Sequence, residues 1–125
     1  MPEDSVNEDP TETLSIDDIA NAKDKVTAAG FVVTGGPIAG SKYLLDTGTS
    51  TLGRHPESTI FFDDITVSRR HAEVTLSANE AKVTDVGSLN GTYLNQRQIN
   101  SSQQLAPGDV LQIGKFKLVY FQESN

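Results

Sequence analysis

Short apolar runs separated by turn residues constrain the fold of this chain more than any other feature. From residue 31 to residue 121 such runs alternate with segments rich in Gly, Pro, Asn and Asp. The run A-E-V-T-L at 72–76 alternates apolar and polar residues, and two further runs flank a turn near Gly114. Strands recurring at intervals of about 8–12 residues favour an antiparallel sandwich or barrel. No window from residue 31 onward has the period of a long amphipathic helix, so we predict an all-β fold.

The first 29 residues have a different composition. They contain eight acidic residues, two lysines and no aromatic residue, whereas every aromatic residue lies at position 31 or later. A segment of this kind cannot bury enough apolar surface to offset the entropy of ordering. We therefore predict a disordered acidic tail (1–29), with either a regulatory or a merely solubilising role, followed by one folded domain (30–125).

Composition also excludes several classes of function. The chain has no cysteine and only two histidines, so we expect no disulfide, no metal site and no cofactor. The apolar runs are too short to span a bilayer, and the acidic N-terminus does not resemble a signal peptide, so we expect a cytoplasmic protein. We also expect it to be a monomer. The net charge of -7 argues against nucleic acids and anionic membranes as partners, although it permits a local cationic pocket.

Three motifs fall at the ends of predicted strands, where loops of a sandwich cluster. They combine arginine forks, hydroxyls, an amide and glycines, and they contain no carboxylate. This set of groups suits an oxyanion such as a phosphate better than acid–base or metal chemistry. The motifs are Gly53-Arg54, Ser68-Arg69-Arg70-His71 and Ser88-Leu89-Asn90-Gly91-Thr92.

The same motifs, in this order, resemble the forkhead-associated (FHA) domain. The resemblance includes G-R-H-P-E-S, D-D-I-T-V-S-R-R-H-A-E and D-V-G-S-L-N-G-T-Y-L-N, and it covers roughly residues 31–122. It implies an FHA-type β-sandwich of about eleven strands that binds phosphothreonine peptides through loops at one end.

The resemblance also implies roles for individual residues. Arg54 and Ser68 are expected to contact the phosphate, and Arg69 to add a second cation. Asn90 is expected to hold the peptide backbone. Residues implied to shape the loops are Gly53, His71, Gly91 and Thr92.

Two positions of the third motif, Ser88 and Leu89, are expected to face the peptide. Many family members have Thr where this chain has Leu89. The contact of that hydroxyl must then come from the backbone or from Ser88.

Alternative interpretations of the motif residues remain open. Ser68 and His71 could form a nucleophile and base, but no G-x-S-x-G elbow surrounds the serine and no acid is placed to orient the histidine, so we expect no enzyme. Arg70 is interpreted as a surface ion-pair partner and Arg97 as part of a solvated hairpin.

In its layout, the chain is similar to small bacterial FHA regulators with a short acidic tail. Those proteins bind 2-oxoglutarate dehydrogenase and glutamate dehydrogenase, and a Ser/Thr protein kinase modifies a tail threonine in an E-T-T-S-V segment. The phosphorylated tail then occupies its own FHA site and ends partner binding.

The tail of this chain departs from that pattern. Here the segment reads T-E-T-L-S-I, so that Thr13 aligns with the first threonine and Leu14 replaces the second, while Thr11 is a further acceptor. The usual F-R-A is replaced by D-D-I. The resemblance thus implies a phosphothreonine-switched adaptor of metabolic enzymes. The alternative is a generic FHA module that binds a phosphorylated kinase or signalling partner, with the tail only a linker.

Overall fold

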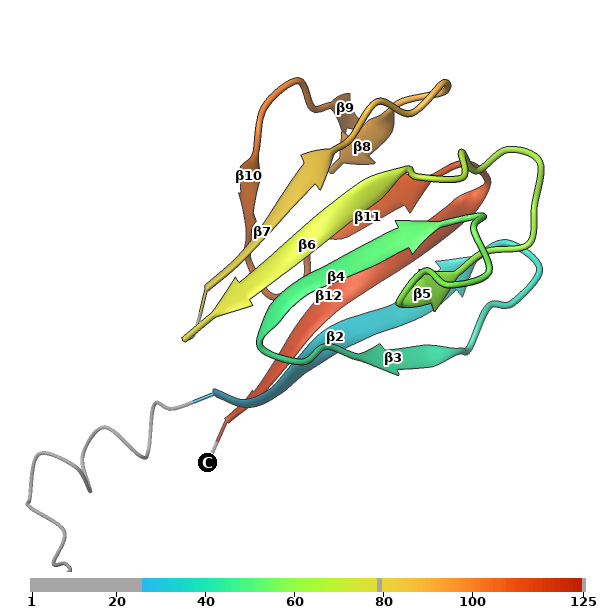
Figure 1. Ribbon diagram of the computed structural model, residues 1–125. Coiled ribbons are helices and arrows are strands. Elements are labelled where there is room, and N and C mark those ends of the chain that lie inside the picture. Colours follow the sequence, from blue (N-terminus) through green and yellow to red (C-terminus); the bar gives the residue numbers. More distant parts are fainter. Residues whose placement is uncertain (1–25, 79, 125) are drawn as a thin grey trace, which may run out of the picture.

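The computed structural model describes residues 26–78 and 80–124, which form two packed β-sheets (Figure 1). One sheet has five strands in the order β10-β7-β6-β4-β5, and the other has six in the order β3-β2-β12-β11-β8-β9. Neighbouring strands are antiparallel except β4 and β5, which are parallel. The strands are β2 (Val26–Gly35), β3 (Lys42–Leu44), β4 (Gly48–Gly53), β5 (Ile60–Phe61), β6 (Ala72–Ser77), β7 (Glu80–Asp85), β8 (Thr92–Leu94), β9 (Arg97–Gln98), β10 (Gln103–Leu105), β11 (Val110–Ile113) and β12 (Phe116–Ser124).

The alternation of apolar and polar residues predicted the strands because one face of each sheet is buried. In β6, Ala72, Val74 and Leu76 are buried while the residues between them are not. The inward faces of both sheets form one core, in which the rings of Phe62 and Phe116 lie 4.7 Å apart between their centroids. The predicted all-β sandwich is confirmed, with eleven strands in the described part of the chain.

The strand register brings several loops to one end of the sandwich. Residue Ala72, which begins β6, is paired with Leu52 near the end of β4 and with Asp85 at the end of β7. In the other sheet, β8 begins and β11 ends at paired positions, Thr92 and Ile113. The β4–β5, β5–β6 and β7–β8 loops therefore share one end of the molecule, here called the apical end.

The strand β2 begins at the opposite end of the sandwich. Val26 is paired with Ser124, the last residue of β12, and the two strands run together to the apical end (Figure 1). β2 thus begins four residues before the domain boundary inferred from charge. Disorder was predicted for residues 1–29; residues 26–29 belong to β2, and residues 1–25 lie outside the described residues. No helix in residues 26–78 and 80–124 is long and apolar enough to cross a membrane.

Candidate functional site

Arg54 is positioned by the chain segment that follows β4. Its backbone N–H donates to the carbonyl of Ser68 over 2.9 Å, and its side-chain Nε donates to the carbonyl of Val67 over 3.0 Å. The guanidinium is therefore fixed against the β5–β6 loop through one nitrogen. Its two terminal amino groups make no hydrogen bond within residues 26–78 and 80–124, so they remain available to an anion.

Gly53 permits this close approach of two backbone segments. A Cβ atom at this position would lie 2.2 Å from the carbonyl oxygen of Arg69, a distance that real Cβ atoms essentially never show. Any larger residue would push the β5–β6 loop away from the end of β4. The implied shaping role of Gly53 thus has a direct steric basis.

Ser68 lies where the second and third motifs meet. Its Oγ accepts a hydrogen bond of 2.9 Å from the backbone N–H of Leu89, which orients the hydroxyl and leaves its proton free to donate. The Leu89 side chain is 89% exposed and contributes no packing. Leu89 therefore contributes through its backbone, and its side chain is presented to solvent at the apical end.

Asn90 joins the same two loops by a second contact. Its Nδ2 donates to the carbonyl of Thr66 over 3.1 Å, while the side chain stays exposed. Its Oδ1 is left as an acceptor for an incoming backbone N–H. Asn90 thereby lies beside the segment that carries Ser68.

Ser88 is engaged inside its own loop. Its hydroxyl donates to Oδ2 of Asp85 and accepts a hydrogen bond of 2.9 Å from the backbone N–H of Gly91. The side chain is expected to shape the loop, since its proton already has a partner. The Leu89 backbone N–H also has a partner, the Ser68 hydroxyl, so the group that replaces the threonine hydroxyl of other family members stays a prediction.

His71 bonds two loops together from within the core. It is fully buried, and its Nδ1 accepts a hydrogen bond of 3.0 Å from the backbone N–H of Ser68. Because Nδ1 is an acceptor, the ring proton lies on Nε2, which donates to the carbonyl of Gly91 over 2.9 Å. The histidine contacts the backbone of Ser68 and not its hydroxyl, so this geometry does not support a nucleophile–base pair.

Asp85 organises the β7–β8 loop, although it was not among the predicted site residues. Its carboxylate accepts hydrogen bonds from the backbone N–H groups of Gly87 and Ser88 and from the hydroxyls of Ser88 and Thr92. Burial raises the pKa of Asp85, but the hydrogen bonds from Ser88, Thr92 and Gly87 outweigh it and hold the pKa below its ordinary value. The D-x-G-S pattern could have indicated this role, because an aspartate side chain often accepts a hydrogen bond from the backbone N–H two residues later in a turn.

Asp64 has the same role in the β5–β6 loop and was also missed. Its Oδ1 accepts hydrogen bonds from the hydroxyl and the backbone N–H of Thr66, over 2.7 and 2.8 Å, and its Oδ2 pairs with Lys115 at 3.0 Å. The Thr66 hydroxyl, then the Thr66 backbone, then Lys115 lower the pKa of Asp64 to about 2. Lys115 also donates its backbone N–H to the Thr66 hydroxyl, which ties the β11–β12 turn to this loop.

Arg69 and Arg70 are exposed cations that have no acidic partner among the described residues. The ion pairs within residues 26–78 and 80–124 are Lys42–Glu123 and Lys115–Asp64, and neither includes these arginines. The ion pair expected for Arg70 is therefore not formed with a described carboxylate. Arg97 is exposed in β9, as expected for a solvated hairpin.

Taken together, the apical loops present fixed donors and uncompensated positive charge. The structure brings Arg54, Ser68 and Asn90 to adjoining loops that are bonded to one another, with Arg69 next to Ser68. Asp64 and Asp85, two carboxylates of these loops, are turned toward hydrogen-bond donors of their own loops. Among the described residues, no group of three His, Cys, Asp or Glu side chains could hold a metal ion. The arrangement suits recognition of an oxyanion.

Comparison with known proteins identifies relatives of this chain. The FHA domain profile matches residues 50–114. The oxoglutarate dehydrogenase inhibitor of Corynebacterium efficiens is 59% identical over 93 residues, which are 74% of this chain and 65% of that protein. The glycogen accumulation regulator GarA of Mycolicibacterium smegmatis is 58% identical over 93 residues, 74% of this chain and 58% of that protein. This chain thus spans about three fifths of the length of these relatives.

A longer match and two solved structures agree. The oxoglutarate dehydrogenase inhibitor of Corynebacterium diphtheriae is 53% identical over 106 residues, 82% of this chain and 73% of that protein. A structure from work on phosphothreonine-dependent FHA domain interactions superposes with a TM-score of 0.72 at 28% identity, covering 79% of this chain and all of that one. The FhaA FHA domain, solved with the intracellular domain of another protein, gives a TM-score of 0.68 at 29% identity, covering 74% and 98%.

Proposed function

The chain belongs to the FHA domain family, and we propose on that premise that it is a phosphothreonine-binding signalling adaptor with no catalytic activity of its own. The observation that carries this proposal is the set of mutual hydrogen bonds that brings the loops of Arg54, Ser68 and Asn90 together. Each charge-assisted hydrogen bond from these donors to a phosphate contributes about 1.5–3 kcal/mol. Arg69 adds an uncompensated charge beside them.

The partners we propose are enzymes of the 2-oxoglutarate and glutamate node. Support comes from relatives that are 53–59% identical and are named oxoglutarate dehydrogenase inhibitors. On this proposal the protein acts in the cytoplasm as a monomer, and it binds 2-oxoglutarate dehydrogenase and glutamate dehydrogenase. A Ser/Thr protein kinase controls that binding.

We further propose that the site is closed when a phosphorylated tail threonine, Thr13 or Thr11, occupies it. The tail joins β2 at Val26, at the end opposite the apical loops, so it must return along the sandwich. The ten residues of β2 span about 33 Å. Thr13 lies thirteen residues before Val26, and that segment reaches about 45 Å when extended. The reach is sufficient, and tethering gives an effective concentration of about 1 mM.

Titration with a peptide of the tail sequence tests the phosphate site. The peptide phosphorylated at Thr13 is expected to bind the full chain at least about 100-fold more tightly than the unmodified peptide, because two charge-assisted hydrogen bonds are gained. The affinity should fall as salt is added, since the gain is electrostatic. Calorimetry measures both effects, and equal affinities for the two peptides would reject the proposed phosphate site.

Replacement of the tail threonine tests the regulation. Kinase treatment of the wild type is expected to abolish binding of 2-oxoglutarate dehydrogenase, whereas Thr13→Ala should retain binding after the same treatment. Thr11→Ala is the matched control and should lose binding after kinase treatment, as the wild type does. If Thr11→Ala retains binding and Thr13→Ala loses it, Thr11 is the acceptor. If kinase treatment has the same effect on the wild type and on the double variant, the tail is only a linker.

A further inference from the structure

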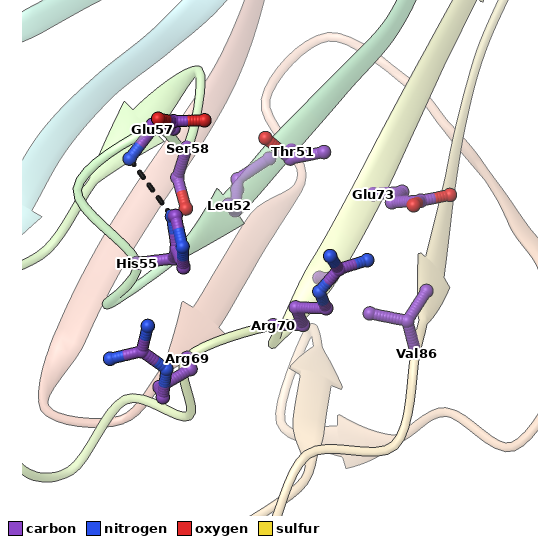
Figure 2. Close-up of a pocket in the computed structure, with 10 residues that line it drawn as sticks. Thr51, Leu52, His55, Glu57, Ser58, Arg69, Arg70, Glu73 and Val86 are labelled. Carbon is purple, nitrogen blue, oxygen red and sulfur yellow. Dashed lines mark hydrogen bonds between the residues drawn. The ribbon is translucent and has the colours of Figure 1, made fainter.

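A pocket of about 330 Å³ is lined by Arg69 and Arg70 (Figure 2), and it shares Arg69 with the proposed phosphate site. Its walls come from the β4–β5 loop, which contributes His55 and Ser58, and from the segment Arg69–Arg70 that precedes β6. Val86, at the start of the β7–β8 loop, closes a third side. We call this cavity the Arg70 pocket.

The base of the Arg70 pocket is the outer surface of the five-stranded sheet. It is formed at the cross-strand pair Thr51 and Glu73, where β4 and β6 lie side by side. The next pair, Leu52 and Ala72, is buried and turns its side chains toward the core. The base of the pocket is thus formed by strands, whereas the neighbouring phosphate site is formed by loops.

Arg69 lines the Arg70 pocket and also directly follows Ser68 in the chain, so the pocket and the phosphate site adjoin. Within the described ranges, neither Arg69 nor Arg70 has an ion pair or a side-chain hydrogen bond. His55 adds another donor, because its Nδ1 already accepts the backbone N–H of Glu57 over 3.0 Å and Nε2 is left facing outward from that contact. The side chains of Arg69, Arg70 and His55 therefore offer the pocket hydrogen-bond donors that have no partner among the described residues.

We propose that the Arg70 pocket binds the carboxylate of an Asp or Glu that flanks the phosphothreonine in the same peptide. The inference rests on the proposed phosphothreonine site, because that site anchors the peptide. An arginine fork matches a carboxylate with two parallel hydrogen bonds. Arg70 thereby selects acidic sequences, while Arg54 and Ser68 select the phosphate.

The acidic residues of the pocket limit the ligand to a single small anion. Glu73 at the base and Glu57 from the β4–β5 loop also line the pocket. Their charge opposes a polyanion that fills the cavity but leaves room for one carboxylate at the two arginines. A strand of nucleic acid is thus excluded, and an acidic side chain is favoured.

The protein's own tail carries acids of the required kind. Glu12 immediately precedes Thr13, and Asp17 and Asp18 follow it four and five residues later. The Arg70 pocket therefore has a candidate occupant on either side of the phosphorylated threonine.

A double-mutant cycle between pocket and peptide tests the proposal. The full chain and its Arg70→Ala variant are titrated with the Thr13-phosphorylated peptide, and with versions carrying Glu12→Gln or Asp17→Asn with Asp18→Asn. Arg70→Ala is expected to weaken the parent peptide about 3- to 10-fold. The same variant should change the affinity of one neutralised peptide less than about 2-fold, which identifies the bound acid.

Two further variants separate a specific contact from a general charge effect. Arg97→Ala removes an equal charge from β9 and should leave all affinities within about 2-fold. Glu73→Gln should raise the affinity for the parent peptide, whereas Arg70→Ala lowers it. This gain should disappear with the peptide whose bound acid is neutralised.

The outcomes distinguish this inference from the function on which it rests. If the wild type binds the phosphopeptide but no neutralised peptide shows coupling to Arg70, the pocket proposal is wrong and the phosphate site stands. If Arg97→Ala weakens binding as much as Arg70→Ala, the effect is long-range and the proposal fails as well. A wild type that binds no phosphothreonine peptide overturns both.

Discussion

Arg54→Ala is expected to reduce affinity for a phosphothreonine peptide at least about 100-fold and to leave the sandwich folded. The variant removes the two terminal amino groups of the guanidinium, which have no other partner among the described residues. Each of them can make a charge-assisted hydrogen bond of about 1.5–3 kcal/mol to the phosphate. Within the protein it removes the Nε contact to the carbonyl of Val67, which contributes about 1 kcal/mol. Calorimetry gives the binding change and urea denaturation gives the stability change.

Two matched variants make this result interpretable. Arg54→Lys retains the charge but loses the fork and the Nε donor, so its affinity should lie between those of the wild type and the alanine variant. Arg97→Ala removes a cation from an exposed hairpin and should leave binding unchanged. Unchanged affinity in Arg54→Ala, with stability also unchanged, would show that the phosphate is bound elsewhere.

His71→Ala is expected to lower the free energy of unfolding by about 3 kcal/mol or more. The substitution opens a cavity and leaves the N–H of Ser68 and the carbonyl of Gly91 without their partners, at about 1–3 kcal/mol for each unsatisfied group. Phosphopeptide binding should weaken in the fraction that remains folded, because the histidine holds the Ser68 and Gly91 loops together. Chemical denaturation with a parallel peptide titration measures both effects.

The histidine's volume and its hydrogen bonds can be separated by His71→Phe. This variant fills the space but cannot bond either loop, so it should remain destabilised, though less than the alanine variant. The partly exposed His55 serves as the comparison, since His55→Ala removes one contact to the N–H of Glu57 and should cost less than about 1 kcal/mol. Full stability in His71→Phe would mean that packing alone explains the buried histidine.

The fold was predictable where burial alternates along the chain and much less so elsewhere. The strands β6 and β12 each bury alternate residues, and that period is legible in the sequence. The strands β5, β9 and β10 are two or three residues long and exist through pairing with distant segments, so no local pattern indicates them. The start of β2 lies in the segment assigned to the tail, because its pairing with β12 is long-range.

Some residues of the candidate site were also predictable from the sequence, and others were not. Arg54, Ser68 and Asn90 were indicated by residue type and by their place at strand ends. Asp64 and Asp85 were not, because their importance lies in hydrogen bonds that form only once each loop has turned back on itself. The orientation of the Ser88 hydroxyl into its loop depends on three-dimensional surroundings that no short motif contains. The same is true of Arg70, which has no ion pair with any residue in 26–78 or 80–124.

The pairing of Val26 with Ser124 has a consequence for how such a chain can change over time. In the proposed closure of the site by its own tail, the number of residues between the tail threonines and Val26 is constrained, because the tail attaches at the end far from the loops. Insertions in this segment only lengthen the tether. Deletion of four or five residues would leave about 30 Å of extended chain, which is shorter than the path of about 33 Å along β2. The same proposal predicts that a phosphorylated protein shortened in this way closes the site of a neighbouring molecule in place of its own.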